Sequence, residues 1–483
     1  MTVAAGPLVL QLGSEAPAVT TEPPLPTPEE RAAGGKRVRG RLPLEDHARC
    51  DPGRSDPVGL LRADDVDRVQ DLVPIRYGRM LTSPFAFYRG SATVMAADLA
   101  QLPHSGLTTQ LCGDAHIANF GVYKSPERRM VFDINDFDET LPGPFEWDVK
   151  RLAASVALAG RENGHSRKDR TATQLATVGA YRRAMRAFAE QGNLEVWYAG
   201  IEVERVLADL APRAGNAARR RAKSNVARAR KRDSTEAVRK LTVIEGGRTR
   251  FRSEPPLLVP LKELLPAVDA RLVRTSLLSI LTAYRETLPS DRRHLLDQYE
   301  LVDVARKVVG VGSVGTRAWV LLLTGRDGND PLVLQAKEAG PSVLEAFVGG
   351  SGMDNAGERV VTGQRLMQAS SDIFLGWQRT SEADGRVHDY YVRQLRDGKA
   401  SASIEEMVPR VLTLYGEVCA WTLARAHART GDRIAIASYL GKRDTFDRAV
   451  AAFAETYAER AEGMFGQLEE AAEAGTVPVT TGV

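Results

Sequence analysis

Cysteine is scarce in this chain, with three residues, Cys50, Cys112 and Cys419, among 483. They lie far apart without CxxC spacing, so we expect neither a disulfide framework nor a zinc knuckle. The seven histidines include no HExxH pair. No apolar run approaches the roughly 18 to 20 residues of a membrane-spanning helix. The short apolar run near the N-terminus has no basic residue before it, so we expect no signal peptide and a cytoplasmic protein.

Net charge is also small, at +3, so the chain has no global attraction to nucleic acid, and a nucleic-acid partner is not expected. Positive charge is concentrated in residues 213–240, which carry eleven Lys or Arg and two Asp or Glu. This segment has a net charge of +9 and leaves −6 for the rest of the chain. A solvated basic helix and a docking surface for an acidic or phosphorylated partner both fit it.

The hydrophobic pattern divides the chain into four regions. Residues 1–45 are rich in Pro, Gly, Ala and charge, which predicts a flexible tail. Residues 46–299 are predicted to be mainly helical, including a buried helix that starts near Phe145. Residues 300–400 change to the period of β-strands, and residues 401–483 return to a helical period. We therefore predict an α+β protein with a mostly helical large part.

The run Gly310-Val311-Gly312-Ser313-Val314-Gly315 matches the GxGxxG pattern. In a dinucleotide-binding fold this loop opens into a helix, whereas here a β-prone run follows, and a further strand ends at Lys337. A hairpin that covers a triphosphate has this order of elements: strand, glycine loop, strand, turn, strand and lysine. A tight hairpin with a surface lysine is the alternative. The candidate nucleotide-binding residues are Gly310, Gly312, Ser313, Gly315 and Lys337.

A second group of polar residues lies in the loop 112–119 and in the segment 133–139. The segment has four carboxylates in seven residues, which repel one another unless cations compensate them. Magnesium favours carboxylate and amide oxygens. An Asp on a loop, an Asn five residues later and an Asp after the next strand can supply one base and two metal ligands. An acidic turn with capping aspartates, or a hydrolytic metal site that uses His116 with Asp114, are the alternatives.

Two further groups have open interpretations. Arg76, Arg79 and Arg89 precede the loop 112–119, with tyrosines between them, and suit phosphate or carboxylate recognition as well as surface ion pairs. His427 lies on a predicted helix face with small apolar residues, which favours a hydrogen-bonded core histidine over a catalytic one.

These motifs resemble known phosphotransferases. The stretch Asp114 to Asn119 resembles the catalytic loop of aminoglycoside and choline phosphotransferases, whose pattern is His-Gly-Asp, four residues, then Asn. Asp136-Phe137-Asp138 resembles their metal-binding motif, and residues 143–152 resemble the segment that follows, where an Asp starts a buried helix beneath the site. From about residue 40, the chain is also similar to an uncharacterised bacterial group, the domain-of-unknown-function 2252 family, which is thought to be protein-kinase-like. The strings that carry this similarity are Ser83–Arg89, Asp133–Arg151 and Gly363–Gln368.

The resemblance implies a bilobal protein-kinase-like fold and ATP- and Mg²⁺-dependent phosphoryl transfer to a hydroxyl group of an unknown small-molecule or protein acceptor. Asp114 would be the catalytic base, and Asn119 and Asp136 would hold magnesium, with Asp133 as a competing ligand. Lys337 would pair with the nucleotide's α- and β-phosphates beneath the glycine loop. A nucleotide-binding pseudokinase or scaffold, or an AMP transferase on the same fold, are the alternatives.

Three departures from the family pattern matter. Cys112 stands where the motif has His, so the backbone of that loop must be anchored differently. The acidic partner of Lys337 is undecided between Glu345 and Glu358. The glycine loop and Lys337 follow Asp114 by about 200 residues instead of preceding it. Since these groups must meet in space and not in sequence, we expect a circularly permuted fold, with the small lobe at 300–400 and its hinge near Tyr391–Leu395.

Overall fold

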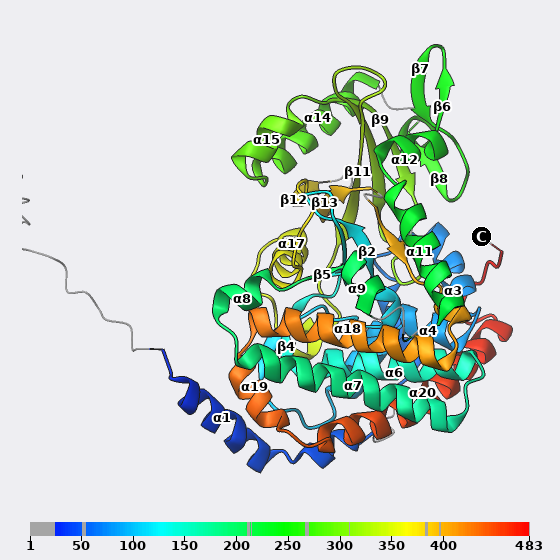
Figure 1. Ribbon diagram of the computed structural model, residues 1–483. Helices are drawn as coiled ribbons and strands as arrows, with labels where there is room; N and C mark the ends of the chain where they lie inside the picture. The colour runs from blue at the N-terminus through cyan, green and yellow to red at the C-terminus, as the bar shows by residue number, and fades with distance from the viewer. Residues whose placement is uncertain are drawn as a thin grey trace, which may run out of the picture.

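The computed structural model describes residues 25–50, 55–209, 213, 215–265, 270–308, 310–381, 385–395 and 398–482. Figure 1 shows a β-rich region above a larger helical region, which confirms the α+β class. Most of the predicted tail, residues 1–24, and residue 214 of the basic segment lie outside the described residues. Among the described helices, none is both long and apolar enough to cross a membrane.

The upper region is built on a six-stranded antiparallel sheet. Its strands, in spatial order, are β12 (Gly376–Ser381), β13 (Val387–Gln394), β11 (Pro331–Ala339), β10 (Ala318–Thr324), β9 (Glu300–Lys307) and β8 (Leu258–Pro260). Alternate residues of β9, β10 and β11, such as Val304, Leu321 and Leu334, share a core with Tyr284 of α14 (Ala270–Glu286). α17 (Ala356–Met367) packs against β12 and β13.

Further helices and a hairpin lie around this sheet or between it and the helical region. They are α11 (Asn216–Arg230), α12 (Ser234–Leu241), the hairpin of β6 (Thr242–Glu245) and β7 (Arg248–Phe251), α13 (Leu261–Leu264), α15 (Ser290–Leu296) and α16 (Glu345–Val348). Because β8 pairs with β9 and α12 contacts β11, the β-rich region starts well before the predicted boundary at residue 300. Residues 234–299 alternate between short strands and helices, so the hydrophobic period does not indicate that they belong to the β-rich region.

The helical region is organised around α6 (Phe145–Glu162), of which 16 of 18 residues are buried. α7 (Arg167–Ala189), α18 (Pro409–Thr430) and α20 (Thr445–Glu473) pack around it, although they come from distant parts of the chain (Figure 1). The N-terminal helices are α2 (Pro57–Asp64), α3 (Val73–Met80), α4 (Pro84–Gly90) and α5 (Ala92–Leu99). The remaining helices are α1 (Pro28–Arg41), α8 (Asn193–Tyr198), α9 (Val203–Asp209) and α19 (Arg433–Leu440), with short 3-10 turns at 44–48, 70–72, 117–119 and 404–406.

Small antiparallel strands join the two regions. β1 (Thr108–Leu111) pairs with β4 (Leu141–Pro144), and a second sheet has the order β14 (Ala400–Ser401), β2 (Phe120–Lys124), β3 (Met130–Ile134) and β5 (Ile201–Glu202). The strands β10 and β11 match the β-prone run after the glycine loop and the further strand that the sequence predicts to end at Lys337. β2 and β12 were not predicted, since each contains or starts at a glycine, which weakens the strand signal.

The expectation of a flexible tail to residue 45 is wrong for its last part, because α1 is a well-capped helix. Thr27 and Glu30 form a capping box, and Pro28 occupies the first helical position. Gly35 then lets α1 approach the backbone of α19, where a Cβ atom would overlap the carbonyl oxygen of Ala435. The composition of residues 25–45 does not indicate this helix, because its capping and its packing depend on a few residues.

Replacing Gly35 with Ala should detach α1 from α19. Overpacking of this kind costs about 1 to 3 kcal/mol of folding free energy. Gly40→Ala is the matched control, because Gly40 is in the same helix and a Cβ atom there meets no other atom within 4 Å. We expect limited proteolysis to cut residues 25–48 faster in Gly35→Ala only. Equal cleavage rates in the two variants would contradict the close packing.

Candidate active site

The sheet register places Lys337 of β11 directly opposite Tyr391 of β13. Both side chains reach the same carboxylate in the loop after β3. The ammonium of Lys337, which is 3% exposed, forms an ion pair with Asp138 Oδ2, and the Tyr391 hydroxyl donates to Asp138 Oδ1 at 2.8 Å. The partner of Lys337 is therefore Asp138, and the expectation of Glu345 or Glu358 is wrong. Asp138 precedes Lys337 by 199 residues, so nothing in the nearby sequence indicates this pairing.

The loop 112–119 is anchored from below by Asp148 of α6. Asp148 Oδ2 accepts from the backbone N–H of Cys112 at 2.8 Å, and Oδ1 accepts from that of Gly113 at 3.1 Å. His427 Nε2 of α18 lies 3.2 Å from Asp148 Oδ2, while its Nδ1 lies 2.8 Å from the Tyr181 hydroxyl. His427 is thus a buried, hydrogen-bonded histidine, as predicted. This shows how the loop is held although Cys112 replaces the expected His.

Asp114 is oriented by Arg151, one turn after Asp148 in α6. Arg151 Nε donates to Asp114 Oδ1 at 2.8 Å, and its guanidinium stacks 3.8 Å from the centre of the Tyr88 ring. Burial raises the pKa of Asp114, and Arg151 opposes this rise. Asn119 Nδ2 donates to the backbone oxygen of Asp114 at 2.9 Å. The Asn119 amide therefore turns its nitrogen toward the loop, which leaves its oxygen available as a ligand.

The two competing aspartates after β3 have different surroundings. Asp133 is 1% exposed, and its Oδ1 pairs with Arg425 of α18 at 2.5 Å while its Oδ2 accepts from the backbone N–H of Ala369 at 2.9 Å. Asp136 lines the cavity described below, and its Oδ1 is 3.4 Å from the backbone nitrogen of Asp138. The structure therefore gives Asp133 a packing role and leaves Asp136 facing the cavity.

A cavity of about 370 Å³ unites most of the candidate residues, and its size falls within the range of about 300 to 1,000 Å³ that small-molecule sites occupy. The predicted residues that line it are Asp114, His116, Asn119, Asp136, Gly310, Gly312 and Ser313. Gly315 packs on Arg68 outside the lining, and Lys337 reaches the cavity only through Asp138. Asp64, Arg68 and Arg89 complete the far wall.

The glycine loop is held over the cavity by arginines from the N-terminal helical segment. Arg68 Nη1 donates to the carbonyl oxygens of Gly312 at 3.0 Å and of Val314 at 2.7 Å, and Arg79 donates to that of Gly310. A Cβ atom on Gly312 would lie 3.2 Å from the carbonyl oxygen of Arg89, so glycine permits a close approach of the two backbones. The carbonyl groups are thus occupied by these donors.

The pKa values of neighbouring carboxylates in the site are shifted in opposite directions. Burial opposes ionisation of Asp138, but the Lys337 ammonium outweighs it and lowers the pKa of Asp138 to about 2. Burial and the negative charge of Asp138 raise the pKa of Asp136. Burial also raises the pKa of Glu139 to about 7. A cation would offset the accumulated negative charge near Asp136.

Arg89, at the end of α4, forms no hydrogen bond or ion pair among the described residues, and its Nε is buried. Burial lowers the pKa of Arg89, while the charges of four carboxylates act in the opposite direction: Asp114, Glu405, Asp136 and Glu162. Arg76, by contrast, forms an ion pair with Asp65, in which Nη1 lies 2.6 Å from Oδ1. Of the three arginines that the sequence singled out, Arg89 is the one placed to bind an anion in the cavity.

No group of three His, Cys, Asp or Glu side chains in the described part of the chain is arranged to hold a metal ion. His116, the ligand of the alternative hydrolytic site, lies with Nε2 3.5 Å from Asp114 Oδ2, and burial lowers its pKa well below its usual range. One carboxylate and one amide oxygen, from Asp136 and Asn119, fit magnesium, which keeps several waters.

Sequence reasoning missed three residues that shape this site. Arg151 has a signal, because it falls three residues after Asp148 and so shares a helix face with it. Arg68 and Arg359 have none. Arg359 of α17 donates to the backbone oxygens of Asp138 at 2.8 Å and Thr140 at 2.7 Å, a contact that joins positions more than 200 residues apart.

The ion pair between Lys337 and Asp138 should be strongly coupled. Lys337→Met leaves a buried carboxylate without its cation, and we expect a loss of about 3 kcal/mol in the free energy of unfolding. Because Asp138→Asn removes the other charge, the double variant should recover a coupling energy of about 1 to 3 kcal/mol in urea unfolding.

The exposed pair of Arg448 and Asp444, 2.9 Å apart in α20, is the matched control for this cycle. Its coupling energy should stay below about 1 kcal/mol because water screens both charges. Additive losses for Lys337→Met and Asp138→Asn would show that the two side chains do not depend on one another.

Comparison with known proteins names a family but no activity. The family described as uncharacterised proteins conserved in bacteria, DUF2252, matches residues 68–471, which include the loop 112–119, Asp136, Asp138, the glycine loop and Lys337 but not Asp64. Neither a curated protein nor a solved structure gives a significant match. With most of its length matched, the chain belongs to the DUF2252 family.

Proposed function

We propose that this protein is an ATP- and Mg²⁺-dependent phosphotransferase with a bilobal, kinase-like arrangement in circularly permuted order, acting in the cytoplasm. The observation that carries the proposal is the convergence of three separate segments on one cavity. The loop with Asp114 and Asn119, the turn with Asp136, and the glycine loop with Gly310 and Gly312 all line it. These are the parts that phosphoryl transfer uses to position and neutralise a nucleotide.

Asp114 would serve as the base that orients the acceptor hydroxyl. Arg151 binds its Oδ1, while Oδ2 has only longer contacts, to Asn119 Nδ2 at 3.4 Å and His116 Nε2 at 3.5 Å, and would accept the proton. Asp148 holds the loop through the backbone N–H groups of Cys112 and Gly113. Phosphoryl transfer needs little covalent participation from the protein, and fixed geometry accounts for much of the rate.

Asn119 and Asp136 would hold magnesium, which when bound neutralises the charge of the phosphate oxygens. Lys337 supplies a positive charge at the same end of the site, and its ammonium is held by Asp138. An incoming triphosphate would compete with Asp138 for this ammonium, since both are anionic. Glycine at 312 lets the loop lie close against the backbone of Arg89, which holds the loop beside the cavity.

Arg89 supports an acidic or phosphorylated acceptor, whether a small molecule or a protein. Its guanidinium forms no ion pair among the described residues, although the charges of nearby carboxylates, Asp114 and Asp136 among them, act on it. An arginine in this position can hold a carboxylate or phosphate of the acceptor in two-pronged geometry. The basic segment at 213–240 is consistent with the same preference.

Nucleotide binding should stabilise the wild-type protein only when the site is intact. At a concentration of MgATP near 100 times its Kd, we expect the thermal midpoint to rise by about 3 °C, and less without magnesium. Asp136→Asn should lose the magnesium-dependent part, whereas Asp444→Asn, an exposed aspartate in the cap of α20, should keep it. No shift with any nucleotide would remove the proposal's main support.

Asp114→Asn should separate binding from turnover. This variant should keep the MgATP-dependent thermal shift but lose about 10²- to 10⁴-fold in rate, the usual contribution of a general base. Turnover is measured as ADP formed from ATP with a bacterial cell extract as the source of acceptors. Binding without ADP formation in the wild type would indicate a pseudokinase or scaffold, and release of diphosphate in place of ADP would indicate AMP transfer.

A further inference from the structure

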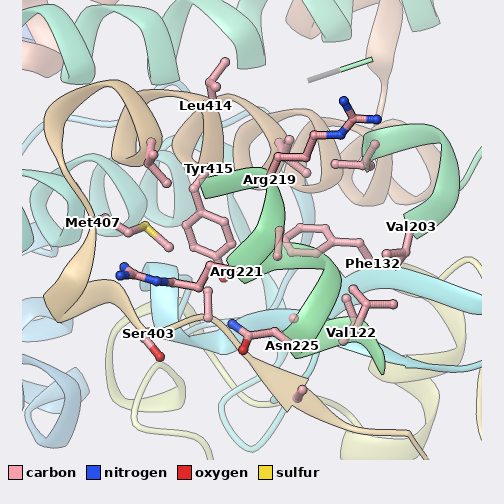
Figure 2. Close-up of a pocket in the computed structure, with 18 of the residues that line it drawn as sticks. Val122, Phe132, Val203, Arg219, Arg221, Asn225, Ser403, Met407, Leu414 and Tyr415 are labelled. Carbon is pink, nitrogen blue, oxygen red and sulfur yellow. The ribbon is translucent and has the colours of Figure 1, made fainter. Parts of the chain in front are cut away.

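A second cavity, of about 530 Å³, lies against the hairpin of β2 and β3, apart from the candidate active site. α11 and the segment that leads into α18 form its other walls (Figure 2). Its volume falls within the range of about 300 to 1,000 Å³ that is usual for small-molecule sites. None of the candidate catalytic or nucleotide-binding residues lines it.

The interior of this cavity is apolar. Val122 of β2 and Phe132 of β3 are cross-strand neighbours on its floor, and Val411 and Tyr415 of α18 face them. The rings of Phe132 and Tyr415 make an edge-to-face contact with centroids 5.8 Å apart (Figure 2). The Tyr415 hydroxyl is turned to the main chain, where it donates to the carbonyl oxygen of Phe120 at 3.0 Å. The ring therefore presents only its carbon surface to the cavity.

The rim of the cavity is positively charged. Arg219 and Arg221 of α11 line it, and Figure 2 shows both guanidinium groups directed away from the apolar floor. Arg221 pairs with Glu406 at 3.1 Å, but both side chains are more than half exposed, so the pair is weak. Arg219 has no ion-pair partner among the described residues. Both arginines belong to the segment 213–240, whose net charge is +9.

We infer that this cavity binds a single-chain amphipathic anion, with the apolar chain inside the cavity and a carboxylate or phosphate head group at Arg219; the guanidinium of Arg221 points the other way in Figure 2 and pairs with Glu406. The apolar floor gains free energy only from an occupant that removes carbon surface from water. The positive charge at the rim disfavours a neutral head group. A wholly polar anion would leave the apolar floor of the cavity exposed to water. This site does not depend on the proposed phosphotransferase activity.

The cavity is connected to the loop that carries Asp114. Besides Phe120, the Tyr415 hydroxyl also contacts the carbonyl oxygen of Ile117 at 3.2 Å, inside the loop 112–119. A ligand that moves the Tyr415 ring therefore acts on the backbone beside Asn119. The hairpin that forms the floor also joins Asn119, just before β2, to Asp136, just after β3.

The test is direct binding to the full chain, measured by titration calorimetry with three probes of equal chain length: dodecanoate, dodecyl phosphate and dodecanol. We expect both anions to bind with one site per chain and dodecanol to bind more weakly. Arg219→Gln should weaken binding of the anions by about fivefold, the change expected for one exposed charge pair, and leave dodecanol unchanged. Arg220→Gln, on the same helix but outside the lining, is the matched control.

Filling the cavity should abolish binding while the protein stays folded. Val411→Trp should reduce the affinity for both anions about tenfold or more, because the chain loses its apolar contacts. Ala222→Phe fills the cavity from α11 and keeps the test valid if Val411→Trp unfolds. Ala452→Trp, on the exposed side of α20, is the control for the added ring. Unchanged binding in Ala222→Phe, or equal affinities for dodecanol and dodecanoate, would overturn the inference.

Discussion

The short turn from Asp136 to Thr140 fixes the position of the β-rich region relative to the helical region. Three elements of the β-rich region contact it: Lys337 and Tyr391 bind the Asp138 carboxylate, and Arg359 binds the backbone of the same residue. Removing these charges from water is costly, and only dense hydrogen bonding compensates for that cost. Since Asp136 belongs to this turn, any change in the grip on Asp138 also moves the carboxylate that faces the cavity.

Helix α6 plays the corresponding part for the other side of the site. Asp148 lies in its first turn, where the helix dipole favours a negative charge, and Arg151 lies one turn further on the same face. One side chain holds the backbone of the loop 112–119 and the other holds Asp114. The geometry of this loop therefore depends on a helix buried on nearly all sides, which is the most rigid support that the fold offers.

The sequence allowed a good prediction of the elements whose signals are local. The strands β10 and β11 and the buried helix α6 follow from composition within a window of a few residues. The partner of Lys337 does not, because a buried charge takes whichever opposite charge the tertiary fold brings near it. For the same reason no sequence signal separates Asp133, which Arg425 neutralises, from Asp136. Arg89 was visible only as one of three arginines with open roles.

The glycine loop follows the loop 112–119 in the chain, and the segments after β13 return from the large sheet to the helical region. After β13 the chain runs down from the large sheet and pairs as β14 with β2, beside the loop that carries Asn119. It then enters α18, which packs on α7 and supplies Arg425 to Asp133 and His427 to Asp148. The C-terminal helices thus complete a layer begun more than 200 residues earlier. The candidate site therefore depends on contacts between segments that lie far apart in the chain, such as Arg425 with Asp133 and His427 with Asp148.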